Sequence, residues 1–506
     1  MGELGRGADG NTERVRAWLE AKLGRVTRIA RQGRWRPVWF ADVERGGEPL
    51  ALCVRGDRVD MPLVFPLAHE MLVQQLLHER GIPVAKVYGL IEQPLAYVMD
   101  RVPGHNDFAG ASAAERASVV DDYLQVLARL HALEVRPFAE AGVLGAPTRA
   151  ESGLYGISRY ERIFRATKNG PEPLMEFCLG WLRRNPPRSQ GRESVIVWDS
   201  GQFHHAGGKL VALLDLELAH IGDPMMDLAA WRMRDTVIGY GDFERLYARY
   251  EQLSGKPVDR PALMRHHFAF TLTNQLVFGA ALREPPAESD LMTNLQWCCE
   301  TNLFATEALA EILELELPGV EMPKARESRA TPALAQLVQS LAAVAPEDGK
   351  RRFAARSEAE SAEPSEVEQW PRVGIRHSVS VRAPAEDEFT RYKLRTMFRL
   401  ARHAARIDEI GEASTCADLD DLHALLGRRP ASWREGEAEL ERFVLEDAGH
   451  GRHDETLVPL FHKRNLRAQL LLGPAGSAMA RHLPIQRFAR PESGRTTQQL
   501  AADRPT

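Results

Sequence analysis

The sequence predicts an α+β protein with a small antiparallel sheet lobe, a larger helical lobe and a further all-α unit at its C-terminal end. Short runs of β-branched and aromatic residues, broken by glycines, fill the first hundred residues or so. From Ala113 onward, apolar residues recur at helical spacing, with one strand-rich island at 194–217. A charged stretch at 345–372, poor in large apolar residues, then precedes a new block of helical patterning.

Residues 1–102 are expected to form the sheet lobe. Residues 1–11 have the composition of a loose leader, and Thr12 is expected to cap a first helix that Gly24 ends. An inserted helix is predicted at 66–80, ended by Gly81. Predicted strands occupy 26–31, 37–44, 50–55, 84–91 and 95–102, and the last two are joined by a hairpin turn at Glu92-Gln93-Pro94.

Residues 103–344 are expected to form the helical lobe. Its predicted helices include 226–236, 242–253, 261–283, 288–315 and 332–344. Residues 345–372 are expected to be a linker to an all-α unit at 373–490, and residues 491–506 a disordered tail. Helical patterning in that unit covers 385–408, 417–426, 434–447 and 456–482. The sequence does not show whether this unit folds alone or packs against the lobes.

Charge and cysteine content exclude several classes of protein. The 65 basic and 70 acidic residues give a net charge of −5, which argues against a nucleic-acid binder because such proteins need a basic surface. The 5 scattered cysteines are too few for a disulfide framework, so a reducing, cytoplasmic setting is expected. The start lacks the apolar core of a signal peptide, and no apolar run is long enough to span a membrane.

The stretch 195–231, VIVWDSGQFHHAGGKLVALLDLELAHIGDPMMDLAAW, is the most specific in the chain. One predicted strand delivers Asp199 into a short loop that contains Gln202. A turn at Gly207-Gly208 returns a second predicted strand, which delivers Asp215 and Glu217. Two carboxylates and an amide are therefore expected at neighbouring strand ends, where their oxygens suit Mg²⁺ and one carboxylate could orient a hydroxyl.

The segment LDLELAHIGDPMMDLA resembles the aminoglycoside phosphotransferase and choline kinase superfamily over its whole length. These proteins are small-molecule kinases with a two-lobed, protein-kinase-like fold. The resemblance is nearest to the branch that occurs alone in bacteria and fused to some acyl-CoA dehydrogenases. It covers roughly residues 15–320, whereas the C-terminal unit resembles no family known to us.

The resemblance implies a role for each matching residue. Asp215 falls on the family's Mg²⁺-binding aspartate, and Asp223 and Asp227 fall on positions that brace the loop and the next helix. Arg55 matches the phosphate-contacting basic residue, and Glu70 matches the helix glutamate that pairs with it. The segment YVMDRVPG matches the hinge whose backbone would bind adenine, here through Val98, Asp100 and Val102.

The catalytic loop departs from the family's H-G-D-x-x-x-x-N pattern. Counting back 13 residues from Asp215 reaches Gln202, where the family has Asn, and five more reach Val197, where the family has its catalytic Asp. Either the loop is shortened by two residues, so that Asp199 is the base and Trp198 replaces the glycine, or the base is lost. Gln202 would keep the amide oxygen of a metal ligand but adds one methylene.

Two hypotheses follow from these residues. The favoured one is a kinase that uses ATP and Mg²⁺ to phosphorylate a hydroxyl of a small molecule, with a hydroxyacyl-type acceptor hinted at by the related branch. The rival is a kinase-like binding or scaffold protein, motivated by Val197, by Gln202 and by the loop at 31–36, which has one glycine, three arginines and Trp35. The C-terminal unit would then bind a protein partner or a second copy. An aminoglycoside-resistance kinase ranks last, because the helical lobe lacks a marked acidic cluster. Glu217 is open between contacting a second metal or a substrate amine and a structural role.

Overall fold

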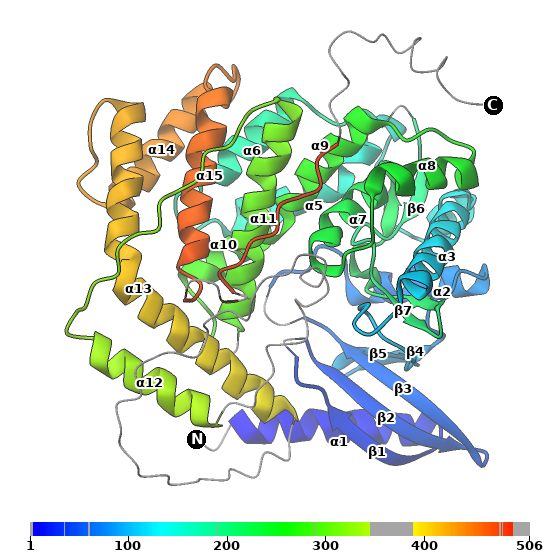
Figure 1. The fold of residues 1–506 in the computed structure, drawn as a ribbon. Helices are drawn as coiled ribbons and strands as arrows, with labels where there is room; N and C mark the ends of the chain where they lie inside the picture. Colours follow the sequence, from blue (N-terminus) through cyan, green and yellow to red (C-terminus); the bar gives the residue numbers. More distant parts are fainter. Residues whose placement is uncertain are drawn as a thin grey trace.

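The computed structural model describes residues 4–344 and 388–488, apart from Trp35, Val59, Asp60, Gln190, Glu288, Ala475, Gly476 and Ala478. Within these ranges the chain forms a sheet lobe, a helical lobe and a set of C-terminal helices that lies beside the helical lobe (Figure 1). The predicted linker at 345–372, the tail at 491–506 and Trp35 lie outside the described residues.

The sheet lobe contains five strands in the order β1-β2-β3-β5-β4, and each neighbouring pair is antiparallel. The strands are β1 Arg25–Arg31, β2 Val38–Arg45, β3 Glu48–Gly56, β4 Val87–Glu92 and β5 Leu95–Asp100. Helix α1, Leu4–Lys22, packs on one face, where Val15, Trp39 and Val54 belong to one apolar core. Helix α2, Leu67–Glu79, lies on the other face. Because side chains alternate along a strand, β3 sends Val54 to the α1 core and Arg55 to the side of α2.

The first helix begins earlier than predicted. Helix α1 starts at Leu4, so the expected loose leader is helical from that residue onward. Thr12 therefore lies inside the helix instead of capping it. Its hydroxyl accepts a hydrogen bond from the Trp39 indole at 2.9 Å, a tertiary contact that the local sequence does not reveal.

The helical lobe packs nine helices around two small sheets in the described part of the chain. The helices are α3 Ala113–His131, α4 Arg136–Glu140, α5 Tyr155–Thr167, α6 Pro173–Arg184, α7 Pro224–Ile238, α8 Phe243–Ser254, α9 Arg260–Thr271, α10 Thr273–Arg283 and α11 Leu291–Ile312. The short strands β6 Ser194–Ile196 and β9 His220–Gly222 pair with each other, as do β7 Phe203–Ala206 and β8 Lys209–Leu213. The sheet lobe and the helical lobe together confirm the predicted fold class.

Two predicted elements end differently in the structure. The predicted strand at 209–217 stops at Leu213, because Asp215 adopts a left-handed conformation with φ 59° that a strand does not accommodate. Glu217 then lies in a short 3₁₀ turn, Leu216–Leu218. The predicted helix at 261–283 is two helices, α9 and α10, which meet at Leu272.

The C-terminal helices α13 Glu388–Leu426, α14 Trp433–Asp447 and α15 Asp454–Leu470 share a core with the helical lobe. Helix α12, Thr331–Val344, was predicted within the helical lobe; it has no buried side chain and packs against α13. The two helices predicted at 385–408 and 417–426 are one continuous α13, and the helix predicted at 456–482 ends at Leu470. Phe461 of α15 stacks on Phe177 of α6 with ring centroids 5.4 Å apart, and both belong to one apolar core. These helices therefore pack on the helical lobe.

Helix α13 reaches from this shared core to the sheet lobe (Figure 1). Leu422, near its C-terminal end, lies in the core with Phe461. Phe389, near its N-terminal end, lies under the guanidinium group of Arg31 at 4.3 Å, at the end of β1. None of the helices in the described ranges is long and apolar enough to cross a membrane.

Candidate active site

A buried aspartate holds the loop that follows β6. The Asp227 side chain on α7 is fully buried and accepts hydrogen bonds from the backbone N–H groups of Val197 at 3.1 Å and Trp198 at 2.6 Å. The same carboxylate lies 3.0 Å from Nε2 of His131 on α3. Asp223 caps the N-terminus of α7 by accepting the Met225 N–H at 2.9 Å. Both aspartates therefore brace the loop and its helix and stay out of the cleft.

The residues before Asp199 point into the core. Val197 and Trp198 are 4% and 1% exposed. Trp198 has φ 57° and packs edge-on against Tyr160 and His220, with centroid distances of 5.6 and 5.3 Å. Trp198 therefore fills space inside the helical lobe and does not occupy a phosphate site.

Asp199, Gln202 and Asp215 meet at one point. Nε2 of Gln202 donates to Oδ2 of Asp199 at 2.7 Å and to Oδ2 of Asp215 at 3.2 Å. One amide group thus bridges the two carboxylates. Asp199 therefore lies beside Gln202 and Asp215, the position that the interpretation with a loop shortened by two residues requires.

Asp199 has a partly buried cationic partner on the other side. Arg234 on α7 forms an ion pair with Oδ1 of Asp199, and its Nε donates to the Ser200 carbonyl at 3.1 Å. Arg234 follows Asp227 by seven residues, so the two side chains lie on the same face of α7. One helix face therefore fixes both the backbone of the loop and the orientation of its carboxylate.

Arg55 of β3 contacts both Glu70 and Asp215. Its Nε lies 2.7 Å from Oε1 of Glu70 on α2, and its NH2 group forms an ion pair with Oδ1 of Asp215. Tyr97 of β5 donates to the same Glu70 oxygen at 3.2 Å. The basic residue, the helix glutamate and the loop aspartate that the sequence singled out are thus in direct contact.

Two further arginines and Glu217 enlarge this cluster. Arg36, in the loop before β2, lies 2.8 Å from Glu70 and 2.6 Å from Glu217. Arg58, just after β3, lies 3.5 Å from Glu217. Three guanidinium groups and three carboxylates therefore form one ionic cluster where the sheet lobe meets the helical lobe.

The surroundings shift the pKa values of Asp199 and Asp215 in opposite directions. Burial raises the pKa of Asp199 above its ordinary value, although the Arg234 charge pulls it down. Burial acts on Asp215 too, but the charges of Arg55 and Arg36 outweigh it and hold the pKa of Asp215 well below its ordinary value. Asp215 is thus suited to remain an anionic ligand, and Asp199 is the better placed of the two to take up a proton.

The cluster has the donors that a magnesium–nucleotide complex requires. In the described parts of the chain, no three His, Cys, Asp or Glu side chains gather closely enough to hold a metal by themselves. Mg²⁺ in kinases takes only one or two carboxylates and completes its shell with phosphate oxygens and water, which Asp215 and a flipped Gln202 amide can satisfy. The guanidinium groups suit phosphate oxygens. The fit requires that Arg55 release Asp215.

The predicted adenine hinge needs one correction. Val98 lies inside β5, fully buried in the α1 core and paired with Val54 and Gly89 on its two sides, so both of its edges are used within the sheet. Asp100 ends β5 and donates its N–H to the Lys86 carbonyl at 2.9 Å. Val102 follows the strand, and its carbonyl faces Nδ1 of His204 at 3.1 Å. The connection between the lobes therefore begins after Asp100, and Val98 is not part of it.

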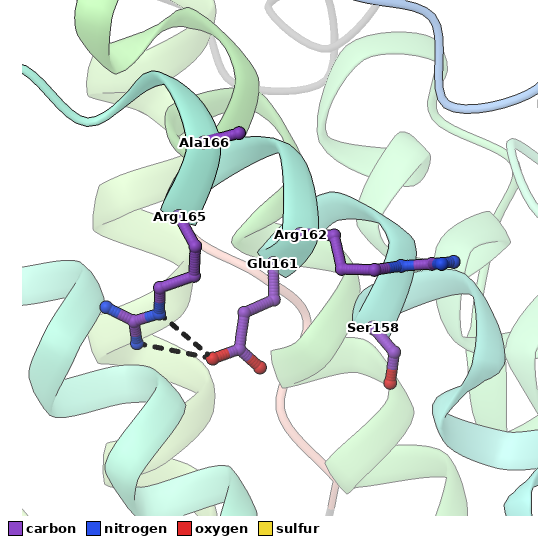
Figure 2. A pocket seen from close by; sticks show the side chains of 5 residues that line it. All are labelled: Ser158, Glu161, Arg162, Arg165 and Ala166. Atoms are coloured by element: carbon purple, nitrogen blue, oxygen red, sulfur yellow. Dashed lines mark hydrogen bonds and ion pairs between the residues drawn. The ribbon is translucent and has the colours of Figure 1, made fainter.

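Two surface hollows lie away from the ionic cluster. One of about 640 Å³ lies along α5 and is lined by Ser158, Glu161, Arg162, Arg165 and Ala166 (Figure 2). These side chains are on the outer face of α5, whereas Tyr160 points inward, so the hollow belongs to the outer surface. The other, of about 530 Å³, lies over β1, β2 and β3 and includes Ala51 and Arg101.

The sequence interpretation missed three arginines of the site and left the role of Glu217 open. Arg36 belonged to the arginine-rich loop at 31–36 but was not predicted as a site residue. Arg58 lies in no motif that would have indicated a role. Arg234 could have been found, because its seven-residue spacing from Asp227 places it on the same helix face. Glu217 makes ion pairs with arginines, a contact of the structural kind that was one of the roles left open for it.

Comparisons with known proteins match part of the chain to a family and to several relatives. The model of the phosphotransferase enzyme family (APH) matches residues 62–265. Acyl-CoA dehydrogenase family member 11 of Rattus norvegicus is 29% identical over 212 residues, which are 39% of this chain and 27% of that protein. Its counterpart in Homo sapiens is 26% identical over 213 residues, 39% of this chain and 26% of that protein. The chain therefore spans about a quarter of the length of these relatives.

Two solved structures are also reported for their similarity to this chain. A putative aminoglycoside phosphotransferase of Ralstonia eutropha is 21% identical with a TM-score of 0.45, covering 57% of this chain and 94% of that one. A choline kinase of Streptococcus pneumoniae is 16% identical with a TM-score of 0.41, covering 59% of this chain and 98% of that one.

The chain combines a sheet lobe with a helical lobe, and loop carboxylates face strand arginines where the two lobes meet. The match of residues 62–265 to the model of the phosphotransferase enzyme family confirms the resemblance seen in the motifs.

Proposed function

We propose that the protein is an ATP-dependent kinase that transfers the γ-phosphoryl group to a hydroxyl of a small molecule. The observation that supports this most is the meeting of Asp199, Gln202 and Asp215 beneath Arg55. In this proposal Asp199 is the proton acceptor, Asp215 is the metal-binding carboxylate and Arg55 is the phosphate-binding cation. The Gln202 amide bridges the two carboxylates, and Arg55 forms an ion pair with Asp215. Phosphoryl transfer depends mainly on such positioning and charge neutralisation.

Each residue has a defined task in this proposal. Asp199, oriented by Arg234, aligns the acceptor hydroxyl and takes its proton as the new bond to the γ-phosphorus forms. The bond from that phosphorus to the β–γ bridging oxygen breaks at the same time, and ADP leaves. Asp215 and the Gln202 amide oxygen would hold Mg²⁺, which neutralises charge on the phosphates. Arg55, held by Glu70, binds phosphate oxygens, and the backbone from Asp100 to Val102 binds adenine. The residues themselves need no covalent intermediate.

The acceptor class is proposed from the relatives. They are acyl-CoA dehydrogenase family members, so an acyl-type small molecule with a free hydroxyl is the first acceptor to test. The aminoglycoside phosphotransferases among the similar structures show a common course of the chain and carry no information on the acceptor here.

A second candidate is a nucleotide-independent binding protein. The ion pair between Arg55 and Asp215 favours it, because it engages the proposed metal ligand with a cation of the same chain. In this case the ionic cluster would be a permanent joint between the lobes and would not open for a ligand.

Calorimetric titration of ATP, with and without Mg²⁺, separates the two candidates. We expect magnesium-dependent binding to the wild type that Asp215→Ala abolishes. Asp121→Asn, which changes a carboxylate on α3 paired with Arg249, is the matched control and should bind ATP as the wild type does. If the wild type fails to bind ATP at millimolar concentration, the kinase proposal is wrong and the binding protein remains.

Transfer itself is tested with Asp199→Asn. This variant should bind magnesium and ATP as the wild type does but should release no ADP with any hydroxylated acceptor that the wild type uses. Undiminished transfer by Asp199→Asn would remove the proton acceptor from the proposal.

A further inference from the structure

Glu217 is surrounded by three arginines from three separate segments. Its Oε2 lies 2.6 Å from NH1 of Arg36 and 3.6 Å from NH2 of Arg55, and its Oε1 lies 3.5 Å from NH1 of Arg58. Arg36 comes from the loop before β2, Arg55 from β3 and Arg58 from the loop after β3. Three guanidinium groups that converge on one anion form the kind of site that binds a phosphate group.

Two of these arginines are held in place without Glu217. Glu70 contacts Arg36 at 2.8 Å and Arg55 at 2.7 Å from the side of α2. Arg36 also donates through Nε to the Gly56 carbonyl at 2.8 Å. The guanidinium groups therefore have a fixed frame on the α2 side, and Glu217 approaches them from the other side.

Glu217 is also the more exposed partner. Its side chain is 20% exposed, whereas those of Arg36, Arg55 and Arg58 are 2%, 10% and 6% exposed. The backbone beneath it is anchored, because Leu216 and Leu218 on either side are buried. The Glu217 side chain can therefore turn away from the arginines while the chain on both sides of it stays in place.

We propose that the Glu217 carboxylate occupies the place of a nucleotide phosphate and must leave its arginines when a polyphosphate binds. The proposal rests on the function proposed above and goes beyond it, because it makes Glu217 a determinant of nucleotide affinity. The Glu217 carboxylate is the anion that Arg36, Arg55 and Arg58 share. Removing its charge makes the surroundings of these three guanidinium groups more positive and favours an incoming anion.

Binding of inorganic tripolyphosphate tests this directly, because it needs neither adenine nor a metal. Calorimetry in the presence of EDTA compares the wild type with Glu217→Gln. We expect the variant to bind tripolyphosphate tighter by a factor on the order of tenfold, the cost of displacing a charge-assisted contact. Equal or weaker binding by Glu217→Gln would overturn the proposal.

Glu70→Gln is the matched control. It removes the same charge from the same two arginines, but on the buried side that holds them. We expect it to weaken tripolyphosphate binding, opposite to Glu217→Gln. If both variants tighten binding alike, the effect is general charge removal and Glu217 has no special place.

Two further measurements keep the test decisive. Glu217→Asp keeps the negative charge, but its side chain is shorter by one methylene and reaches the arginines less well. The affinity of this variant for tripolyphosphate should therefore fall between those of the wild type and Glu217→Gln. If Glu217→Gln does not fold, as judged by its thermal unfolding, an affinity of Glu217→Asp no tighter than that of the wild type overturns the proposal. A metal ligand at Glu217 would instead show as weaker ATP binding in Mg²⁺ with no change in EDTA, which also overturns it.

The outcomes separate this inference from the proposed function. If Glu217→Gln binds tripolyphosphate tighter and the wild type does not bind ATP, the inference about Glu217 is supported and the kinase proposal is wrong. If the wild type binds ATP in Mg²⁺ and Glu217→Gln binds tripolyphosphate no tighter than the wild type, the kinase proposal is supported and the inference about Glu217 is wrong.

Discussion

The ionic cluster between the lobes and the joint with the C-terminal helices both connect distant parts of the chain, but the first is formed by charged side chains and the second by apolar ones. In the ionic cluster, Arg36 and Arg55 of the sheet lobe face Asp215 and Glu217 of the helical lobe. At the joint, Phe461 stacks on Phe177 inside one apolar core, with ion pairs such as Arg184–Asp454 beside it. The core under α1 is separate from this one.

The difference shows which contact is built to change. An apolar contact has no competitor in water, so the joint stays closed under all conditions in which the protein is folded. An ionic contact can be exchanged for another anion or cation of similar geometry. The ionic cluster is therefore the contact that a charged ligand can open. The joint is a fixed support for the helical lobe.

The largest effect is expected at the centre of the joint. Phe461→Ala removes a ring that is 2% exposed and should lower the free energy of unfolding by about 3–5 kcal/mol. Urea unfolding measures it. Leu445→Ala on α14, at a residue 50% exposed, is the control and should change little. A Phe461→Ala loss no greater than that of the control would mean that the C-terminal helices do not share this core.

A smaller loss is expected beneath the catalytic loop. Asp227→Asn turns one oxygen into a donor that cannot accept from Val197 or Trp198, which should cost about 2 kcal/mol. Hydrogen exchange of the amides at 197–198 should speed up at the same time. Unchanged protection of those amides would show that Asp227 does not hold the loop.

The next effect concerns pH and separates the cleft from the joint. Arg234→Gln removes the charge that lowers the pKa of Asp199, so burial raises that pKa further. A higher pKa keeps the base protonated to higher pH, and the acid limb of the ATP hydrolysis rate should therefore move to higher pH. The rate at alkaline pH should stay near that of the wild type. Arg245→Gln, at an exposed arginine of α8, should leave the profile unmoved. An unmoved profile in Arg234→Gln would contradict the pairing.

The smallest effect is expected beside the apolar centre of the joint. Arg184 binds both oxygens of Asp454, at 2.6 and 2.7 Å, and both side chains are partly exposed. Arg184→Met should cost about 1 kcal/mol, because solvent screens such a pair and the methionine keeps the apolar stem. The same urea experiment measures it. A loss as large as that of Phe461→Ala would mean that ion pairs hold the joint.

The motif residues and the strand patterns could be predicted from the sequence because each depends on local spacing. Alternation along β3 is enough to send Arg55 to the face opposite Val54, and the match around Asp215 is a run of adjacent residues. Val98 was predicted in the hinge between the lobes but lies inside β5. The end of β5 depends on its pairing with β3 and β4, which the local sequence does not encode.

The chain by itself thus determined the two lobes and the acidic loop, since these follow from periodicity and from a contiguous motif, whereas the pairing of Arg55 with Glu70 was implied by the family resemblance. Only the tertiary structure brought Asp199 beside Gln202 and Asp215, because that depends on Val197 and Trp198 turning into the core on Asp227. It also brought Arg36 within 2.6 Å of Glu217, 181 residues away in the chain. Contacts between charges so far apart in sequence depend on how the lobes meet, and no local pattern records that.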